Sequence, residues 1–215
     1  MPLNNISLPT PNVASKSRTG TRHPSNDDSC DFFEVSRGDS SGAVYVAVVA
    51  DGVTGTVGGA QASRIAVETV KATLQDAPSR QETLSEWLEF AILRANEEIL
   101  FEAKRNPQWK NMSTTIVLAA LAGEKLYVMH LGDSRAYLLR GDALYQLVAD
   151  HTWTQEAIQN GIITAQEALS HPGRNQLLRY LGTTKQVGVD RGVIAPGSNH
   201  REEYLTVQPG DEILL

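Results

Sequence analysis

The sequence predicts an α+β fold with a largely antiparallel sheet system. The 215 residues are 41% hydrophobic and 20% charged, which is enough apolar material for a packed interior and too little charge for a disordered chain. Apolar runs occur in consecutive pairs around short turns, a pattern typical of hairpins. Helical periodicity is confined to separate blocks and does not alternate with strands, which argues against a parallel sheet.

The first half of the chain predicts one buried strand followed by two helices. Residues 43–50 form a Val-rich run that stops at Asp51-Gly52, as a strand ending in a turn does. Thr83 and Glu86 have the spacing of a capping box, which predicts the start of the second helix. The apolar stripe of the first helix is Ala62, Ala66, Val70 and Leu74, and that of the second is Leu84, Leu88, Ile92, Ala95 and Ile99.

The second half predicts two hairpins, two short helices and a closing pair of strands. Gly123 and Gly141 lie in the expected turns, and Thr164 opens the second short helix with Glu167 in a capping box. The predicted strands are 115–121, 125–131, 136–139, 143–147, 204–207 and 212–215. The first short helix covers residues 154–159.

We expect a flexible N-terminal segment over residues 1–17, rich in Asn, Ser and Pro, and one domain over residues 18–215. The net charge of −6 and the lack of a Lys/Arg block argue against nucleic-acid binding. No apolar stretch is long enough for a membrane span. A single cysteine, Cys30, excludes an intrachain disulfide and is interpreted as an ordinary small side chain. These features predict a cytoplasmic monomer.

Acidic residues stand at predicted strand ends and turns, in Asn26-Asp27-Asp28, Asp51-Gly52, Asp133 and Asp150. A strand that delivers a carboxylate to a Gly turn offers side-chain and backbone oxygens to one cation, as magnesium and manganese prefer. Asp51-Gly52 is the best candidate position. The alternative is that each Asp bonds its own backbone as a turn former. Motifs for zinc proteases, P-loops and serine hydrolases are absent from the sequence.

The five histidines are weak candidates for ligands or bases. We interpret His23, His130 and His200 as structural. His151 follows Asp150 and His171 precedes Pro172, positions that suit a functional role, although a local turn bond is the favoured interpretation for each.

Four blocks, in order along the chain, resemble the type 2C metal-dependent serine/threonine protein phosphatases (the PPM family), bacterial branch. The resemblance covers about residues 18–215. The blocks are Asn26-Asp27-Asp28, Val49-Ala50-Asp51-Gly52 with its following glycines and Ala62-Ser63, Met112 to Thr115 continuing through Gly132-Asp133-Ser134-Arg135 to Asp150-His151, and His171-Pro172-Gly173-Arg174-Asn175 continuing to Leu181-Gly182.

The resemblance implies an αββα sandwich that binds two magnesium or manganese ions, with a third, weaker site. Asp51 would bridge the two ions and Gly52 would offer its carbonyl. Arg22 would clamp the phosphate, since its guanidinium matches two phosphate oxygens. The implied metal ligands are Asp27, Asp28, Asp51, Gly52 and Asp133; the implied catalytic residues are Arg22 and Asp51.

The implied activity is hydrolysis of phosphoserine and phosphothreonine in proteins by metal-activated water, opposing a cognate kinase. Three departures keep a second interpretation open, a non-catalytic phosphoprotein-binding or regulatory module. Arg22 stands four residues before Asn26 where relatives have three, and Val53-Thr54-Gly55-Thr56 replaces a family segment that ends in histidine. The chain also stops at Leu215, before two further family aspartates, so we expect the sandwich to be incomplete at the C-terminus and leave the activity of these 215 residues alone open.

Overall fold

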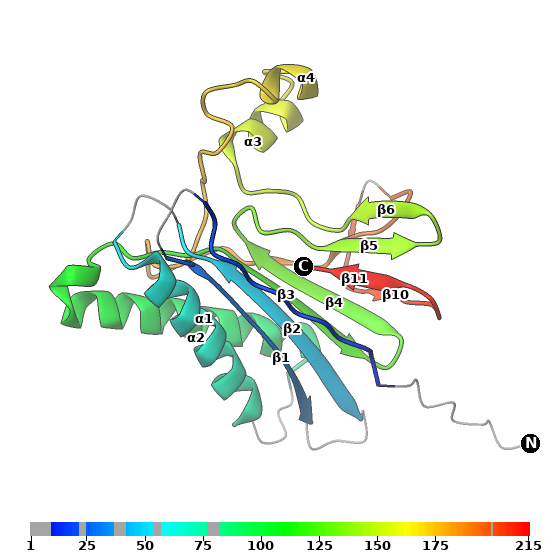
Figure 1. Ribbon diagram of the computed structural model, residues 1–215. Helices are drawn as coiled ribbons and strands as arrows, with labels where there is room; N and C mark the ends of the chain where they lie inside the picture. The colour runs from blue at the N-terminus through cyan, green and yellow to red at the C-terminus, as the bar shows by residue number, and fades with distance from the viewer. Residues whose placement is uncertain (1–9, 22–24, 37–41, 54–56, 77–81, 199) are drawn as a thin grey trace, which may run out of the picture.

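The computed structural model describes residues 10–21, 25–36, 42–53, 57–76, 82–198 and 200–215 (Figure 1). Two larger antiparallel sheets and a helical layer form its body, a third sheet consists only of the short strands β8 and β9, and the segment with α3 and α4 stands out from the body. The helices are α1 (Gly59–Gln75), α2 (Leu84–Arg105), the 3-10 helix η1 (Pro107–Trp109), α3 (Trp153–Gln159) and α4 (Ala165–Ala168). The strands are β1 (Asp28–Ser36), β2 (Ala43–Asp51), β3 (Ile116–Ala122), β4 (Lys125–Leu131), β5 (Tyr137–Arg140), β6 (Ala143–Gln146), β7 (Asp190–Arg191), β8 (Val193–Ile194), β9 (Arg201–Glu202), β10 (Leu205–Thr206) and β11 (Glu212–Leu214).

The first sheet has the strand order β1-β2-β3-β4-β10, and β7 also pairs with β4. Helices α1 and α2 cover one of its faces (Figure 1). Side chains alternate between the two faces of each strand, as the pleat requires. In β3, Ile116, Leu118 and Ala120 join the core under the helices, whereas Val117 and Ala119 join the core under the second sheet. The first sheet is therefore buried on both sides.

The second sheet has the order β11-β5-β6 and packs on the face of the first sheet opposite the helices. Leu138 of β5 meets Val128 of β4 in the core between the sheets, and both side chains are fully buried. Described residues thus form three layers of the predicted αββα order. The α+β class, with mainly antiparallel sheets, is confirmed.

Most predicted elements are confirmed within a few residues. Strand β1 is a finding of the structure, because residues 28–36 mix Asp, Cys, Phe and Glu without a clean alternation. The two closing strands do not pair with each other. Strand β10 pairs with β4 of the first sheet, and β11 pairs with β5 of the second. The turn at Gly210 therefore joins two sheets, which local sequence cannot reveal.

The long helix α2 begins with the predicted capping box. The Thr83 hydroxyl accepts the Glu86 N–H at 3.2 Å, and the Glu86 carboxylate accepts the Thr83 N–H at 2.8 Å. The Thr83 N–H and the Thr83 hydroxyl, which both donate to the Glu86 carboxylate, hold the pKa of Glu86 below its usual value. Helix α4 begins with the same arrangement at Thr164 and Glu167. In the described part of the chain, no helix combines the length and apolar character needed to cross a membrane.

Substitution of the two capping threonines should separate a core helix from a peripheral one. Thr83→Ala is expected to lower the free energy of unfolding by about 1 kcal/mol, because α2 carries much of the core under the helices. Thr164→Ala is the matched control, since α4 has four residues and none of them is buried. Urea unfolding followed by far-UV circular dichroism measures both; equal losses would contradict this view of the core.

Candidate metal centre at the edge of the first sheet

The predicted acidic residues Asp28 and Asp51 lie side by side at one edge of the first sheet. Asp28 opens β1, Asp51 ends β2, and the two are direct partners in the antiparallel register. Directly opposed residues project to the same face with Cβ atoms about 5 Å apart. The structure therefore brings together two carboxylates that are 23 positions apart in sequence.

Gly52 allows the backbone to close tightly behind these carboxylates. Its N–H donates to the carbonyl of Asp27 at 3.0 Å. A Cβ at Gly52 would lie 2.4 Å from the carbonyl carbon of Gly59, at the start of α1, and 2.8 Å from the Asp27 oxygen. Ser63 on α1 also donates to that oxygen, at 2.6 Å. Only glycine fits at position 52, and the close approach joins β1, β2 and α1.

Two buried threonines attach the end of β2 to the turn that carries Asp133. The Thr115 hydroxyl accepts the N–H of Asp51 at 3.1 Å and lies 2.6 Å from the Ser134 hydroxyl. The Thr114 hydroxyl and the Thr115 N–H donate to the Asp51 carbonyl at 2.8 and 2.9 Å. The backbone N–H and carbonyl of Asp51 are thus both hydrogen-bonded, and its carboxyl group interacts with Asp28.

The electrostatics of Asp51 show that the acidic residues act on one another. Partial burial of its carboxyl group, the neighbouring Asp28 carboxyl group, and the negative charges of Asp133 and Asp27 together raise the pKa of Asp51 to about 7. Burial also raises the pKa of Asp133. Four of the predicted ligand residues therefore form one acidic cluster, which we call the Asp51 cluster: Asp27, Asp28, Asp51 and Asp133.

The chemistry of the Asp51 cluster fits a hard divalent cation. Carboxylate oxygens, with the neighbouring Gly52 carbonyl as a further donor, are the ligands that magnesium and manganese prefer. A cation would relieve the mutual repulsion that raises the pKa of Asp51. The remaining predicted site residue, Arg22, lies outside the described residues, as do His23 and Thr54 to Thr56.

The structure corrects the prediction of a local turn bond at Asp150 and His151. Asp150 instead accepts two hydrogen bonds from Arg135, at 2.7 and 2.6 Å, and the His151 ring accepts the N–H of Gly132. Both partners, Gly132 and Arg135, belong to the turn that carries Asp133. The prediction for His171 is confirmed, because its Nδ1 accepts the nearby N–H of Gly173 at 3.0 Å. His130, interpreted as structural, is fully buried.

Sequence reasoning missed Asp190, which faces His151 and His130 beneath the turn at Gly132. Ligand-type atoms of these three residues all lie within 4.8 Å of one another. The Asp190 carboxylate is bound by Arg179 and Arg201, at 2.9 and 2.6 Å. The sequence Val189-Asp190-Arg191 gives little signal of this role, since a lone Asp between apolar and basic residues is typical of an exposed strand.

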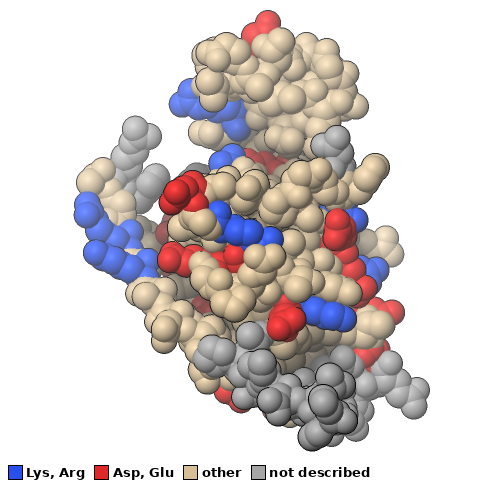
Figure 2. Space-filling view, turned by 90° about the vertical axis from the view of Figure 1, so that its right-hand side faces the viewer, with Lys and Arg blue, Asp and Glu red and all other residues tan. Residues whose placement is uncertain are grey.

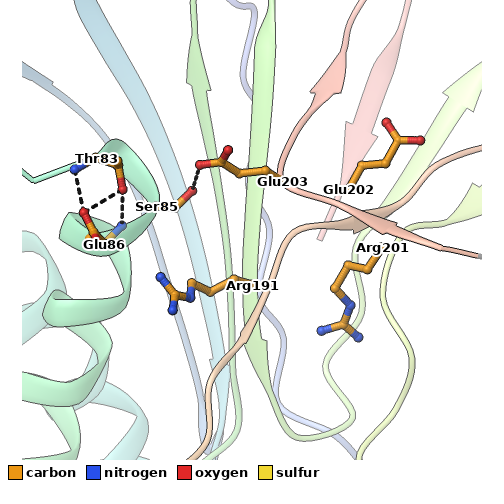
Figure 3. A pocket seen from close by; sticks show the side chains of 7 residues that line it. All are labelled: Thr83, Ser85, Glu86, Arg191, Arg201, Glu202 and Glu203. Carbon is orange, nitrogen blue, oxygen red and sulfur yellow. Dashed lines mark hydrogen bonds between the residues drawn. The ribbon is translucent and has the colours of Figure 1, made fainter.

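A separate open cavity of about 300 Å³ lies between the start of α2 and the strands β7 and β9 (Figure 3). Two of its charged groups have partners: Glu203 accepts a hydrogen bond from Ser85 at 2.7 Å, and Arg191 pairs with Glu89, outside the lining, at 3.4 Å. None of its lining residues belongs to the Asp51 cluster. They are Thr83, Ser85, Glu86, Arg191, Arg201, Glu202 and Glu203.

The face in Figure 2 does not favour one sign of charge. On it, acidic and basic side chains lie side by side, and the segment with α3 and α4 projects above the body. The net charge of −6 is a modest excess of acidic residues over the chain. The acidic edge of the first sheet is therefore a local feature of the fold and not part of a wholly acidic molecule.

The fold defines the class of the protein, because solved bacterial serine/threonine phosphatases superpose on it. Stp1 from Staphylococcus aureus superposes with a TM-score of 0.74 at 28% identity, over 82% of this chain and 68% of that one. The catalytic domain of PstP, solved in complex with 2 manganese ions, superposes with a TM-score of 0.68 at 26% identity, over 93% and 74%.

The sequence profile of the Protein phosphatase 2C family matches residues 19–215, so the chain belongs to this family. The serine/threonine phosphatase stp of Listeria innocua is 34% identical over 151 residues, which are 69% of this chain and 60% of the relative. PstP of Mycobacterium tuberculosis is 33% identical over 168 residues, 78% of this chain and 30% of the relative. The matched part thus spans less than two thirds of each of these relatives.

The close approach at Gly52 can be tested by adding one methyl group. Gly52→Ala is expected to lower the free energy of unfolding by about 1–3 kcal/mol, because the new Cβ would overlap the backbone of Gly59 and force α1 and β2 apart. Gly20→Ala is the matched control, since a Cβ there meets nothing within 4 Å. Chemical denaturation measures both; a neutral Gly52→Ala would show that α1 does not pack here as described.

Proposed function

We propose that this chain carries the metal-dependent active site of a protein phosphatase that hydrolyses phosphoserine and phosphothreonine. The observation that carries the proposal is the Asp51 cluster, in which neighbouring carboxylates and partial burial raise the pKa of Asp51 to about 7. Repelling carboxylates held by a rigid sheet are a typical design for binding divalent cations. The names of the relatives as serine/threonine phosphatases, and the two manganese ions in the PstP complex, support it.

Each residue of the cluster has a role in this proposal. Asp51 and the Gly52 carbonyl would hold the magnesium or manganese ions. Asp28, with Asp27, would complete the N-terminal side, and Asp133 would serve a third, weaker site. When bound, such ions would supply positive charge against the phosphate dianion and a lowered pKa for the water that attacks phosphorus. A side-chain nucleophile is unnecessary, which agrees with the ordinary setting of Cys30 on β1.

Arg22 is proposed as the phosphate clamp, since guanidinium and phosphate form paired charge-assisted hydrogen bonds. Substrates would be phosphorylated proteins, and a cognate serine/threonine kinase would supply them. A monomeric state and a cytoplasmic location stay predictions. The segment Val53 to Thr56 lacks the histidine that ends the corresponding family segment, which favours the second candidate, a phosphoprotein-binding module without turnover. The experiments below separate the two candidates.

Asp51→Asn tests the metal centre. The amide keeps the size of the carboxylate but loses the charge that holds two cations, so manganese affinity should fall by at least the roughly 10–100-fold seen when a metal ligand merely loses its supporting partner. Manganese-dependent hydrolysis of a phosphothreonine peptide should be abolished. Calorimetric titration and phosphate release measure the two effects.

Asp142→Asn, on the exposed turn between β5 and β6, is the matched control and should behave as wild type. A folded Asp51→Asn protein that keeps its manganese affinity would refute the metal assignment. Manganese binding without hydrolysis by the wild-type chain would favour the binding module.

Arg22→Ala tests the phosphate clamp. Loss of the guanidinium should mainly raise KM for a phosphopeptide, because a contact made in both the ground state and the transition state is removed. Manganese affinity should stay unchanged. Arg18→Ala is the control; if Arg18→Ala raises KM and Arg22→Ala does not, the one-residue offset before Asn26 has moved the clamp to Arg18.

A further inference from the structure

The buried ring of His151 holds the turn that carries Asp133. The His151 backbone N–H donates to the Gly132 carbonyl at 2.9 Å, and its ring Nδ1 accepts the Gly132 N–H at 3.0 Å. One residue therefore satisfies both backbone groups of Gly132. Because Nδ1 accepts, it carries no proton, and in the neutral ring the proton resides on Nε2.

The opposite side of the His151 ring is anchored by Asp190. Nε2 lies 3.1 Å from Oδ2 of Asp190, a close contact although its alignment falls short of an ideal hydrogen bond. Burial alone would raise the pKa of Asp190, but bonds from His151, Arg179 and Arg201 hold it well below its usual range. His130 stacks on the His151 ring at 4.3 Å between centroids. The ring is thus fixed on its edge and on its face.

The same arrangement argues against a second metal site at these residues. His151 would have to bind a cation through Nε2, which carries the proton while Nδ1 accepts from Gly132. The Asp190 carboxylate is already neutralised by two guanidinium groups, which would repel a cation. Burial and the nearby His151 lower the pKa of His130 to about 4, so its Nε2–H donates to the Ala149 carbonyl in the neutral state.

The turn at Gly132 needs such support because it has an unusual backbone. Gly132 has φ of 118°, and a Cβ there would lie 2.6 Å from the Thr115 side chain. This conformation is strained for any other residue, and it aims the following Asp133 toward the edge with Asp51. Without an acceptor for the buried N–H of Gly132, this turn conformation would be destabilised, and the turn would adopt other conformations.

We propose that His151 is a positioning residue for the metal centre: it holds the Gly132–Asp133 turn so that Asp133 can bind a divalent cation. The inference rests on the proposed function, because it assigns Asp133 to that centre. His151 does not contact the cation itself. The Nδ1 atom of His151 accepts the Gly132 N–H, and Asp190 keeps the ring in the orientation that points Nδ1 at this N–H.

Two amide substitutions test the two ring nitrogens of His151 separately. In His151→Asn the amide oxygen takes the place of Nδ1 and can still accept from Gly132. In His151→Gln the amide takes the place of Nε2 and faces Asp190, so the Gly132 acceptor is lost. His200→Gln, at an exposed histidine, is the control for a histidine-to-amide change.

Amide NMR spectra of the chain give two readouts. Without metal, exchange of the Gly132 N–H should accelerate roughly tenfold in His151→Gln, as expected for one lost hydrogen bond, and stay near wild type in His151→Asn. On titration with magnesium, the amide shift change at Asp133 should require roughly 10–100-fold more metal in His151→Gln, whereas the shift changes at Asp51 and Gly52 should be unchanged.

The outcomes separate the inference from the proposed function. If His151→Asn and His151→Gln behave alike, or if the magnesium-induced shift changes at Asp51 and Asp133 weaken together, His151 only fills the core and the positioning role is refuted. If the wild-type chain shows no saturable shift changes at Asp28, Asp51 or Asp133, the proposed metal centre is refuted in the wild type itself. In a folded Asp133→Asn background, His151→Gln should cause no further loss of manganese affinity.

Discussion

The approach of Gly52 to Gly59 and to the Asp27 carbonyl is the contact on which the rest of this edge depends. It ends β2, begins α1 and fixes the start of β1 within one small volume. Because the strands β1 and β2 are antiparallel, the same contact places Asp28 opposite Asp51. A side chain at position 52 would separate these elements, and the two carboxylates would part with them.

Placing four acidic residues at one edge costs free energy, and the fold offsets it elsewhere. The raised pKa values of Asp51 and Asp133 express this cost. The first sheet packs into a core on each of its faces. Its buried side chains are Val44, Val46 and Leu118 on the helix side and Val117 and Val128 on the side of the second sheet. Such a sheet is rigid, so mutual repulsion cannot push the carboxylates apart.

Residues of the second half of the chain hold this part of the first sheet in place through hydrogen bonds. Thr115 links the Asp51 backbone to Ser134, Arg135 holds Asp150, and His151 holds Gly132. These bonds join residues between 15 and 64 positions apart. The family blocks that look separate in sequence therefore meet as one structure, with charged side chains at the edge and their hydrogen-bonding partners behind them.

The sequence by itself determined the α+β class, the helices with capping boxes, most strands, and the acidic residues of the candidate centre, because periodicity, caps and turn residues are local signals. Strand β1 escaped prediction since its pattern is irregular, and β7, β8 and β9 escaped it because each has only two residues. Arg22 lies outside the described residues. Only the tertiary structure decided that β10 and β11 join different sheets, that Asp150 and His151 bind the distant 132–135 turn, and that Asp190 stands behind them. These outcomes depend on pairing between remote segments, whose free energy comes from packing that no local pattern encodes.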